Sequence, residues 1–363
     1  MRTIKKQLLV LTAVLAFFGV QINAQDQWEP QTKISGYLST EFNYFNDLDG
    51  YDKEYGVALS EAGILASYQP LKDVSLKMVF VYRPDYSIDQ MINEANIQYR
   101  LSQNVNFKVG RFLTPLSPMN TYYYAPVNIS ATLPVLISNH EFFPLNMDAI
   151  SLNGKFGDDV SISYDVFAGG YNNAMWLNTG AVGFFGNEVS YYGALLNSPF
   201  TIDDSYKATR NLAVGGNIRF AYQDYVNIGL SMFNSQKEKV PAMVMGNNSV
   251  LIFDSERFSY GIDAKLSYNN TQLIGGFWNS DLTINNKFID HKGAFVELNH
   301  SFVKITPYVR YEDQTSFYIE FQRYTGGVMY KPSFETTLKC EYLHYEQEVQ
   351  NLDGFVVSLI YSF

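Results

Sequence analysis

Apolar and polar residues alternate one by one along most of this chain, which is the period of a β-strand rather than of a helix. The clearest segment places Ile34, Leu38 and Phe42 on one face, with Ser39 and Glu41 on the other. Segments with this alternation occupy residues 34–44, 55–68, 74–83, 91–100, 105–112, 148–156, 160–169, 211–221, 225–234, 258–268, 271–279, 292–300, 304–312, 320–330, 334–342 and 353–363. Most have roughly the 9–11 residues with which a tilted strand crosses a bilayer. No helical segment is predicted outside the amino-terminal leader.

The connections between these segments alternate in length. Those after even-numbered strands are short and polar: 70–73, 102–104, 157–159, 223–224, 269–270, 301–303 and 331–333. Those after odd-numbered strands are mostly longer, and the longest are 113–147 and 170–210. A soluble β-sandwich has no reason to sort its loops in this way. The pattern predicts an all-β fold, an antiparallel up-and-down transmembrane β-barrel of about 16 strands with short periplasmic turns and long external loops.

Aromatic residues mark the ends of the even-numbered strands. Amphipathic rings prefer the membrane–water interface, so an outward aromatic residue is expected where each strand leaves the bilayer. The residues at these positions are Tyr68, Tyr99, Phe156, Phe220, Tyr268, Phe302, Tyr330 and Phe363. Closing the barrel at the last strand leaves no free edge, which lipid would not tolerate.

The amino terminus resembles a secretory signal peptide. Arg2, Lys5 and Lys6 precede an apolar run at 8–20, and Ala24 supplies the small residue before the expected cleavage site. The prediction is a signal peptide at 1–24, followed by a single transmembrane β-barrel domain at 25–363 with an inward-folding loop at about 113–147.

Composition narrows the class of protein further. Charged residues make up 17% of the chain and aromatic residues 16%, and no apolar run is long enough for a spanning helix. A formal net charge of −10 disfavours nucleic acid as a partner. Cys340 is the only cysteine, so no intrachain disulfide is expected.

The segment Lys108–Leu116, which reads KVGRFLTPL, resembles the glycine-basic-aromatic-x-x-proline stretch that leads into the third loop of Gram-negative porins. The chain as a whole, from residue 32 to 363, resembles the porin-like family that includes the phosphate-selective porins. This resemblance implies a trimer of water-filled channels in the outer membrane, surrounded by lipid and passing small hydrophilic solutes by diffusion. It also implies that Phe363 is read by the barrel assembly machinery.

Basic residues gather on the inward face of neighbouring strands, where a porin selects its solutes. The predicted lining of the constriction is Lys77, Arg83, Glu94, Arg100, Lys108 and Arg111. Strict alternation would turn Arg111 outward unless a bulge at Gly110 reorients it. The hypothesis is a weakly anion-favouring channel, and the alternative is a mixed wall whose paired charges only keep the lumen wet.

The loop at 113–147 is unusually apolar for an external connection, and long loops are usually functional. Folding it into the barrel would bury its apolar residues and create the narrowest point of the channel. His140 and Glu141 are then expected near the basic wall. The alternative is that this loop packs on a neighbouring protomer or a surface partner.

Other functions remain open at this point. Aromatic residues at 170–210 could stack on sugar rings or form a lid. A non-conducting barrel serving adhesion or secretion-complex assembly is the alternative to a porin, although only about eight residues precede the first strand, too few for a plug domain. The four histidines are scattered without metal-ligand spacing, so neither a barrel enzyme nor a metal or cofactor is predicted.

Overall fold

The computed structural model describes residues 29–46, 54–84, 91–121, 124–138, 142–171, 200–201, 211–244, 249–284, 287–316, 319–347 and 351–363. The predicted signal peptide at 1–24 lies outside these residues. In the described part of the chain no helix has the length and hydropathy needed to span a membrane.

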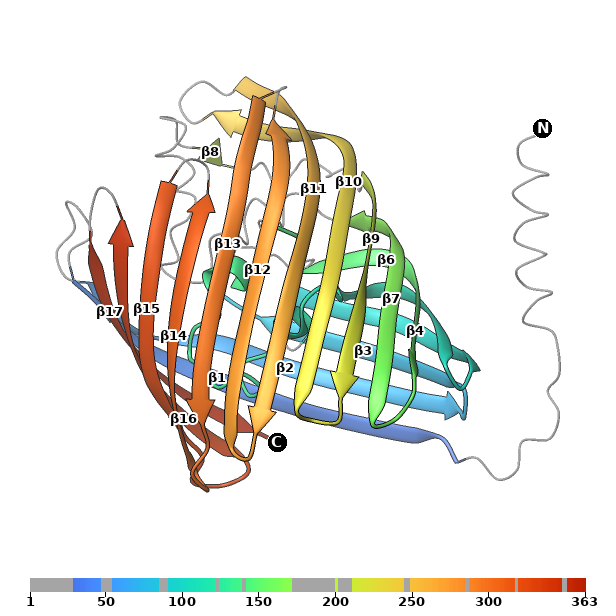
Figure 1. The fold of residues 1–363 in the computed structure, drawn as a ribbon, viewed down its shortest axis with the longest axis horizontal. Coiled ribbons are helices and arrows are strands. Elements are labelled where there is room, and N and C mark those ends of the chain that lie inside the picture. Colours follow the sequence, from blue (N-terminus) through green and yellow to red (C-terminus); the bar gives the residue numbers. More distant parts are fainter. Residues whose placement is uncertain are drawn as a thin grey trace.

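The described residues form one antiparallel sheet that closes on itself (Figure 1). Its strands are β1 (Gln31–Phe45), β2 (Glu54–Leu71), β3 (Val74–Tyr82), β4 (Ile92–Ser102), β5 (Val105–Leu113), β6 (Asn146–Phe156), β7 (Val160–Tyr171), β8 (Phe200–Thr201), β9 (Asn211–Tyr222), β10 (Val226–Val244), β11 (Ser249–Tyr268), β12 (Thr271–Ile284), β13 (Lys287–His300), β14 (Ile305–Ser316), β15 (Ile319–Tyr330), β16 (Thr336–Gln347) and β17 (Leu352–Ser362). Apart from β8, which has two residues, each strand pairs with the next along the chain. The predicted barrel of 16 strands is therefore confirmed.

The two ends of the chain close the barrel. Strand β1 pairs with β2 on one side and with β17 on the other, where Leu38 stands opposite Tyr361. The backbone of the last residue, Phe363, exchanges hydrogen bonds of 2.8 and 2.9 Å with Gly36. No strand edge is left free at this seam, which is the condition for a sheet surrounded by lipid.

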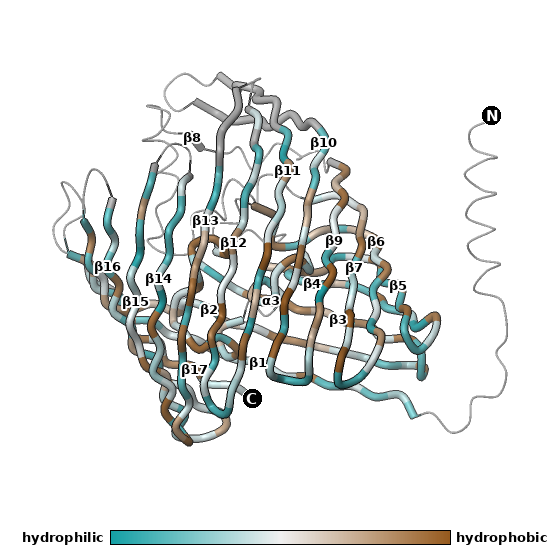
Figure 2. The backbone as a smooth tube through the Cα atoms, viewed as in Figure 1, coloured by the Kyte–Doolittle hydropathy of each residue, from teal (hydrophilic) through white to brown (hydrophobic). Residues whose placement is uncertain are grey.

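Hydrophobic and hydrophilic residues alternate along the strands (Figure 2), and their exposure separates an apolar outer face from a more polar inner face. On β1, Ile34 is 69% exposed and Leu38 48%, whereas Tyr37 and Ser39 face inward and are buried. All eight aromatic residues expected at the short-turn end are exposed, from 37% for Tyr99 to 73% for Tyr268. The outer surface therefore has the apolar band and one of the aromatic girdles of a membrane barrel.

Several strands are longer than the alternation predicts, most of all β10 and β11. Strand β10 continues as far as Val244, and β11 already begins at Ser249. Strands β12 and β13 are also longer at this end of the barrel (Figure 1). A register shift between Ser235 and Glu238 interrupts the alternation, and the following residues Lys237 and Lys239 are charged. The segment therefore reads as a loop in the sequence although the ladder of backbone hydrogen bonds continues.

Large inward-facing aromatic side chains lie across glycines of the neighbouring strand. A Cβ atom placed on Gly261 would come within 2.3 Å of the Trp278 ring, and one on Gly63 within 2.2 Å of Tyr37. Without a side chain at these glycines, the rings lie flat on the wall. This arrangement leaves room inside the barrel for another segment of the chain.

Candidate functional site

The described residues between β5 and β6, which are 114–121, 124–138 and 142–145, lie inside the barrel (Figure 2). We call it the inner loop. It contains two single-turn helices that the sequence does not predict, α3 (Pro118–Thr121) and α4 (Val135–Ser138). Six of its large apolar side chains are almost completely buried: Leu116, Leu136, Ile137, Phe142, Phe143 and Leu145.

The inner loop and the barrel wall share one hydrophobic core. Phe143 and Trp278 of β12 have ring centroids 4.7 Å apart, and Phe142 lies 6.5 Å from the same indole. The cluster also takes in Phe167 of β7 and Phe233 of β10. Burial of these aromatic residues stabilises the loop inside the barrel by the hydrophobic effect.

Carboxylates of β2 and β4 bind the middle of the inner loop. Glu61 of β2 accepts hydrogen bonds from Tyr37, from Arg83 at 2.9 Å and from the backbone N–H of Ala125 at 3.3 Å. The Tyr124 hydroxyl donates to Glu94 of β4 at 2.8 Å. Burial, and next the adjacent Glu94 carboxylate, raise the pKa of Tyr124 far above its usual value of 10.0, so the hydroxyl keeps the proton that it donates.

Charged residues of β14 and β16, across the β1–β17 seam from β2, bind the next part of the loop. Glu341 accepts from the backbone N–H groups of Ala131 and Thr132, at 2.9 and 3.2 Å, and from the hydroxyl of Tyr308 at 2.5 Å. Arg310 donates to the carbonyl oxygen of Thr132 at 3.0 Å. The loop backbone thus supplies both donors and acceptors to oppositely charged wall residues.

The neighbouring wall positions extend this network along the loop. Glu312 accepts from the backbone N–H of Val135 at 2.7 Å, and Arg323 donates to the carbonyl oxygen of Leu133 at 2.6 Å. Lys339 donates to the carbonyl oxygens of Ala125 and Ser130, at 2.7 and 3.0 Å. These three wall side chains are at most 2% exposed. A wall facing open water would leave such charges accessible, so the inner loop covers this part of the lumen.

The first residues of the inner loop are held by β9 and β10. Asn217 donates to the carbonyl oxygen of Pro115, and Ser231 donates to that of Leu116 at 2.6 Å. The inner loop is therefore bound at residues 115–116, at residues 124–125 and at residues 130–135, by strands on several sides of the barrel.

The structure pairs most of the predicted basic lining with carboxylates. Ion pairs join Arg83 to Glu61 at 2.8 Å, Lys77 to Glu94 at 2.7 Å and Lys108 to Asp165 at 3.8 Å. Arg100 is exposed beside a short turn, where its backbone N–H bonds to Asp73. The predicted bases are therefore not one cluster of unbalanced positive charge.

Arg111 has a different setting. It stands opposite Ala95 and Asp148, two residues from the exposed Val109, with no register shift at Gly110. Gly110 has a positive φ of 120°, but alternation places Arg111 on the face of Val109 rather than on that of Lys108. Its guanidinium is 2.7 Å from Asp148. His140 and Glu141 lie outside the described residues.

Sequence reasoning missed several residues that bind the inner loop or neutralise the wall. Glu61, Asp148 and Arg323 have contacts with residues distant in the sequence. Glu61 directly follows a register shift between β1 and β2, which obscures its face in a simple alternation. The only signal in the sequence is a charged residue at an inward-facing strand position, and this signal is lost where a register shift breaks the alternation.

A polar cavity of about 460 Å³ lies between the inner loop and the short-turn ends of β5 to β10. We call it the amide cavity, because carboxamides line much of it. Its polar lining includes Gln103, Asn106, Ser117, Thr121, Asn153, Lys155, Ser163, Asp165, Asn217, Arg219 and Asn227. This is a part of the described lumen in which polar side chains surround open space.

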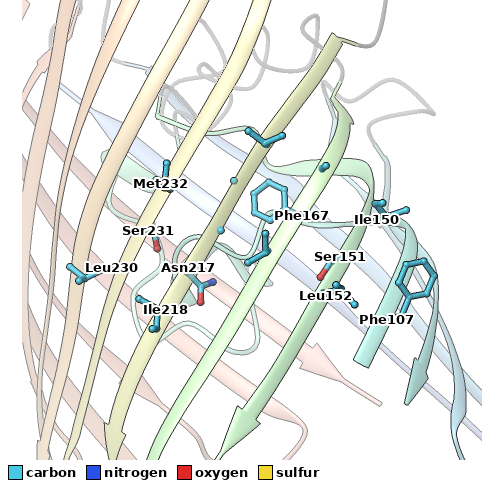
Figure 3. Close-up of a pocket in the computed structure, with 15 residues that line it drawn as sticks. Phe107, Ile150, Ser151, Leu152, Phe167, Asn217, Ile218, Leu230, Ser231 and Met232 are labelled. Atoms are coloured by element: carbon cyan, nitrogen blue, oxygen red, sulfur yellow. The ribbon is translucent and has the colours of Figure 1, made fainter. Parts of the chain in front are cut away.

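A larger groove, of about 740 Å³, is apolar and involves the outer face of β6, β7, β9 and β10 (Figure 3). Leu152, Ile218 and Leu230 in its lining are each about half exposed, as expected of side chains that face lipid. This groove therefore belongs to the membrane-facing surface and offers few groups to a hydrophilic solute.

The described histidines do not form a metal site. His344 lies 2.8 Å from Asp353 and 3.5 Å from Glu346 at one end of the barrel. His300 lies beside a short turn, 2.7 Å from Thr271. In the parts of the chain that the structure covers, no three His, Cys, Asp or Glu residues are grouped to hold a metal ion.

Comparison with known proteins gives no match to a family model and none to a curated protein sequence. Solved structures do match over nearly the whole chain. An anion-selective porin from Comamonas acidovorans has a TM-score of 0.62 at 11% identity, covering 92% of this chain and 100% of that one. OmpTdeltaL8, an outer membrane protein of Vibrio cholerae with loop L8 deleted, has a TM-score of 0.62 at 14% identity, covering 92% and 99%.

Salmonella typhi OmpF, solved in a complex with daunomycin, has a TM-score of 0.60 at 11% identity, covering 92% of this chain and 97% of that one. Sequence identities this low establish the fold alone. The closed 16-stranded barrel, the apolar outer face and the loop folded into the lumen are observed in the structure of this chain itself. The chain therefore has the fold of the outer-membrane porins.

Proposed function

We propose that this protein is an outer-membrane porin through which small hydrophilic solutes diffuse passively. The observation that carries the proposal is the amide cavity, an open polar space of about 460 Å³ inside a closed barrel whose outer face is apolar. A hydrophilic solute can enter such a space without losing all its hydrogen-bonding partners. The porin folds found by comparison support the same function.

The inner loop sets the size limit in this proposal. It is bound at its start by Ser231 on β10 and further along by Glu341 on β16, six strands away around the barrel, so it crosses the lumen instead of lining one wall. The open cross-section that remains is narrow, and we expect a small single-channel conductance.

The ion preference of the channel is weak. Lys77, Arg83 and Lys108 each have a carboxylate partner, which cancels most of their field in the lumen. Arg100 and Lys155 are exposed and have no ion-pair partner among the described residues, and we assign the weak preference of the channel to them. An anion preference of modest size follows, decreasing further at high salt because exposed charges are screened.

The proposed setting is that of porins in general: a homotrimer in outer-membrane lipid, exported with its leader removed and inserted by the barrel assembly machinery through Phe363. A trimer form is recorded for the Vibrio cholerae protein OmpT, which has a similar fold. Transport by diffusion involves no covalent step, so no catalytic residue is assigned.

Conductance of the purified, folded barrel in a planar bilayer tests the proposal. Ohmic single-channel steps, with a reversal potential under a salt gradient that indicates weak anion preference, are the expected result. The proposal would be refuted by a barrel that never conducts although its heat-modifiable gel mobility shows that it is folded.

The second candidate is a non-conducting barrel used in adhesion or secretion-complex assembly. It is favoured by the burial of wall charges such as Arg310 and Glu341, which are 3% and 0% exposed beneath the inner loop. Deleting residues 120–143 separates the two candidates. A porin gains conductance on loop deletion from a measurable starting value, whereas a plugged barrel conducts only after the deletion.

A further inference from the structure

The amide cavity is built mainly from neutral polar side chains. Asn106 of β5, Asn153 of β6, Asn217 of β9 and Asn227 of β10 line it from four strands. Ser117 and Thr121 of the inner loop line it from the loop side. A carboxamide has both a hydrogen-bond donor and an acceptor, and four of them face one space.

Bonds within the wall orient these carboxamides and use only part of their capacity. The Asn106 Nδ2 donates to Asn153 Oδ1 at 3.3 Å, and Asn227 Oδ1 accepts from Arg219 at 2.8 Å. Asn217 Nδ2 donates to the carbonyl oxygen of Pro115. Within the described residues, Oδ1 of Asn106, Oδ1 of Asn217 and Nδ2 of Asn227 make no hydrogen bond, which leaves two acceptors and a donor for a solute.

Two of the three charged residues that line the cavity, Arg219 and Asp165, have ion-pair partners in the wall, and the third, Lys155, is exposed. Arg219 binds Asp263 with both terminal nitrogens, at 2.6 and 2.9 Å. This pair crosses β10 over Gly229, where an added Cβ would come within 2.4 Å of the guanidinium. Asp165 accepts from Ser151 at 2.7 Å and lies 3.8 Å from Lys108. These two pairs provide polarity and little net field, which leaves the neutral carboxamides as the main groups that a solute meets.

We propose that the amide cavity is a binding subsite for a neutral polyhydroxylated solute of the size of a sugar or polyol. Each hydroxyl group donates and accepts, as the lining carboxamides do. The volume of about 460 Å³ is within the range of small-molecule sites, roughly 300–1,000 Å³. The inference rests on the proposed channel function, since it names the solute class that the channel retains on its way through.

The test is saturation-transfer difference NMR on the folded protein in detergent micelles, with glucose and sucrose as neutral probes and glucose 6-phosphate as the charged probe. Binding does not require conduction in this measurement. The expected result is saturable contact with the neutral probes at a dissociation constant on the order of millimolar, and weaker contact with the phosphate. Block of single-channel current by sucrose is measured in parallel.

The matched variants are Asn106→Leu/Asn153→Leu and Gln272→Leu. The first replaces a hydrogen-bonded pair by two apolar side chains of similar size, a change that stability tolerates. The second removes a half-exposed carboxamide of β12 that does not line the cavity. Losing two carboxamides is expected to weaken sugar binding about tenfold, and the control variant should bind as the unaltered protein does. Gel mobility on heating checks that each barrel is folded.

Each outcome decides a separate question. Sugar binding that is lost only in the double variant supports the subsite. A conducting protein without saturable sugar contact, or with equal binding in the double variant, overturns the subsite and leaves the channel function intact. Sugar binding without conduction supports the subsite while refuting diffusion through the barrel.

Discussion

Replacing Glu341 by alanine removes the wall carboxylate that accepts the most bonds near Thr132. The carboxylate accepts from the N–H groups of Ala131 and Thr132, from the Thr132 hydroxyl and from Tyr308. It is 0% exposed, so these donors would lose their partner in a place with little water. Truncating one member of a buried charged network costs about 3–5 kcal/mol.

This free energy is lost from the attachment of the inner loop, because the backbone ladder of β16 does not depend on the Glu341 side chain. At about 1.4 kcal/mol for each factor of ten, the detached state of residues 130–133 becomes at least a hundredfold more populated. Hydrogen–deuterium exchange followed by mass spectrometry measures this directly. Peptides covering residues 130–135 should exchange at least a hundredfold faster, while peptides from β6 and β7 should keep their rates.

Two further variants sharpen the measurement. Glu341→Gln keeps an acceptor oxygen for the backbone N–H groups, so its effect should be smaller than that of alanine. Glu335→Gln changes an exposed carboxylate on the same side of the barrel and should leave exchange unchanged. Unaltered exchange at residues 130–135 in Glu341→Ala, in a folded barrel, would refute the view that wall charges hold the loop.

Three other changes are predicted. Gly261→Val places side-chain atoms in the space of the Trp278 ring, 2.3 Å from a Cβ, and should lower the free energy of unfolding by about 1–3 kcal/mol in urea titrations. Gly326→Ala is its control, because no atom lies within 4 Å of the added Cβ, and an equal loss there would contradict the packing argument. Asp165→Asn removes the partner of Lys108, and it should raise the anion-to-cation permeability ratio by up to about fivefold at low salt, measured by reversal potential. Asp158→Asn, in an exposed short turn, should leave that ratio unchanged, and a similar shift in both variants would refute a local effect. In Arg310→Met, the carbonyl of Thr132 loses its donor, so single-channel conductance should rise, and constant conductance would show that this contact does not restrict the pore.

The number and faces of the strands could be predicted because they depend on local alternation. A side chain on a strand faces either lipid or the interior, and lipid accepts only apolar residues, so one face of each strand is marked in the sequence. The positions of Tyr68 and Phe156 at the membrane interface followed from the same reasoning, and both are exposed there. The long ends of β10 and β11 were missed because a register shift at Ser235 breaks the alternation.

The electrostatics of the lumen depended on contacts that alternation does not encode. Arg83 is inward as expected, but its partner Glu61 belongs to another strand and follows a register shift. The N–H of Ala131 meets Glu341 across 210 residues of sequence. Alternation determined which residues share a face, since it is a property of neighbouring positions. Closure of the barrel alone decided which charges neutralise one another and how far the inner loop crosses the lumen, because only the closed sheet brings distant strands to one interior.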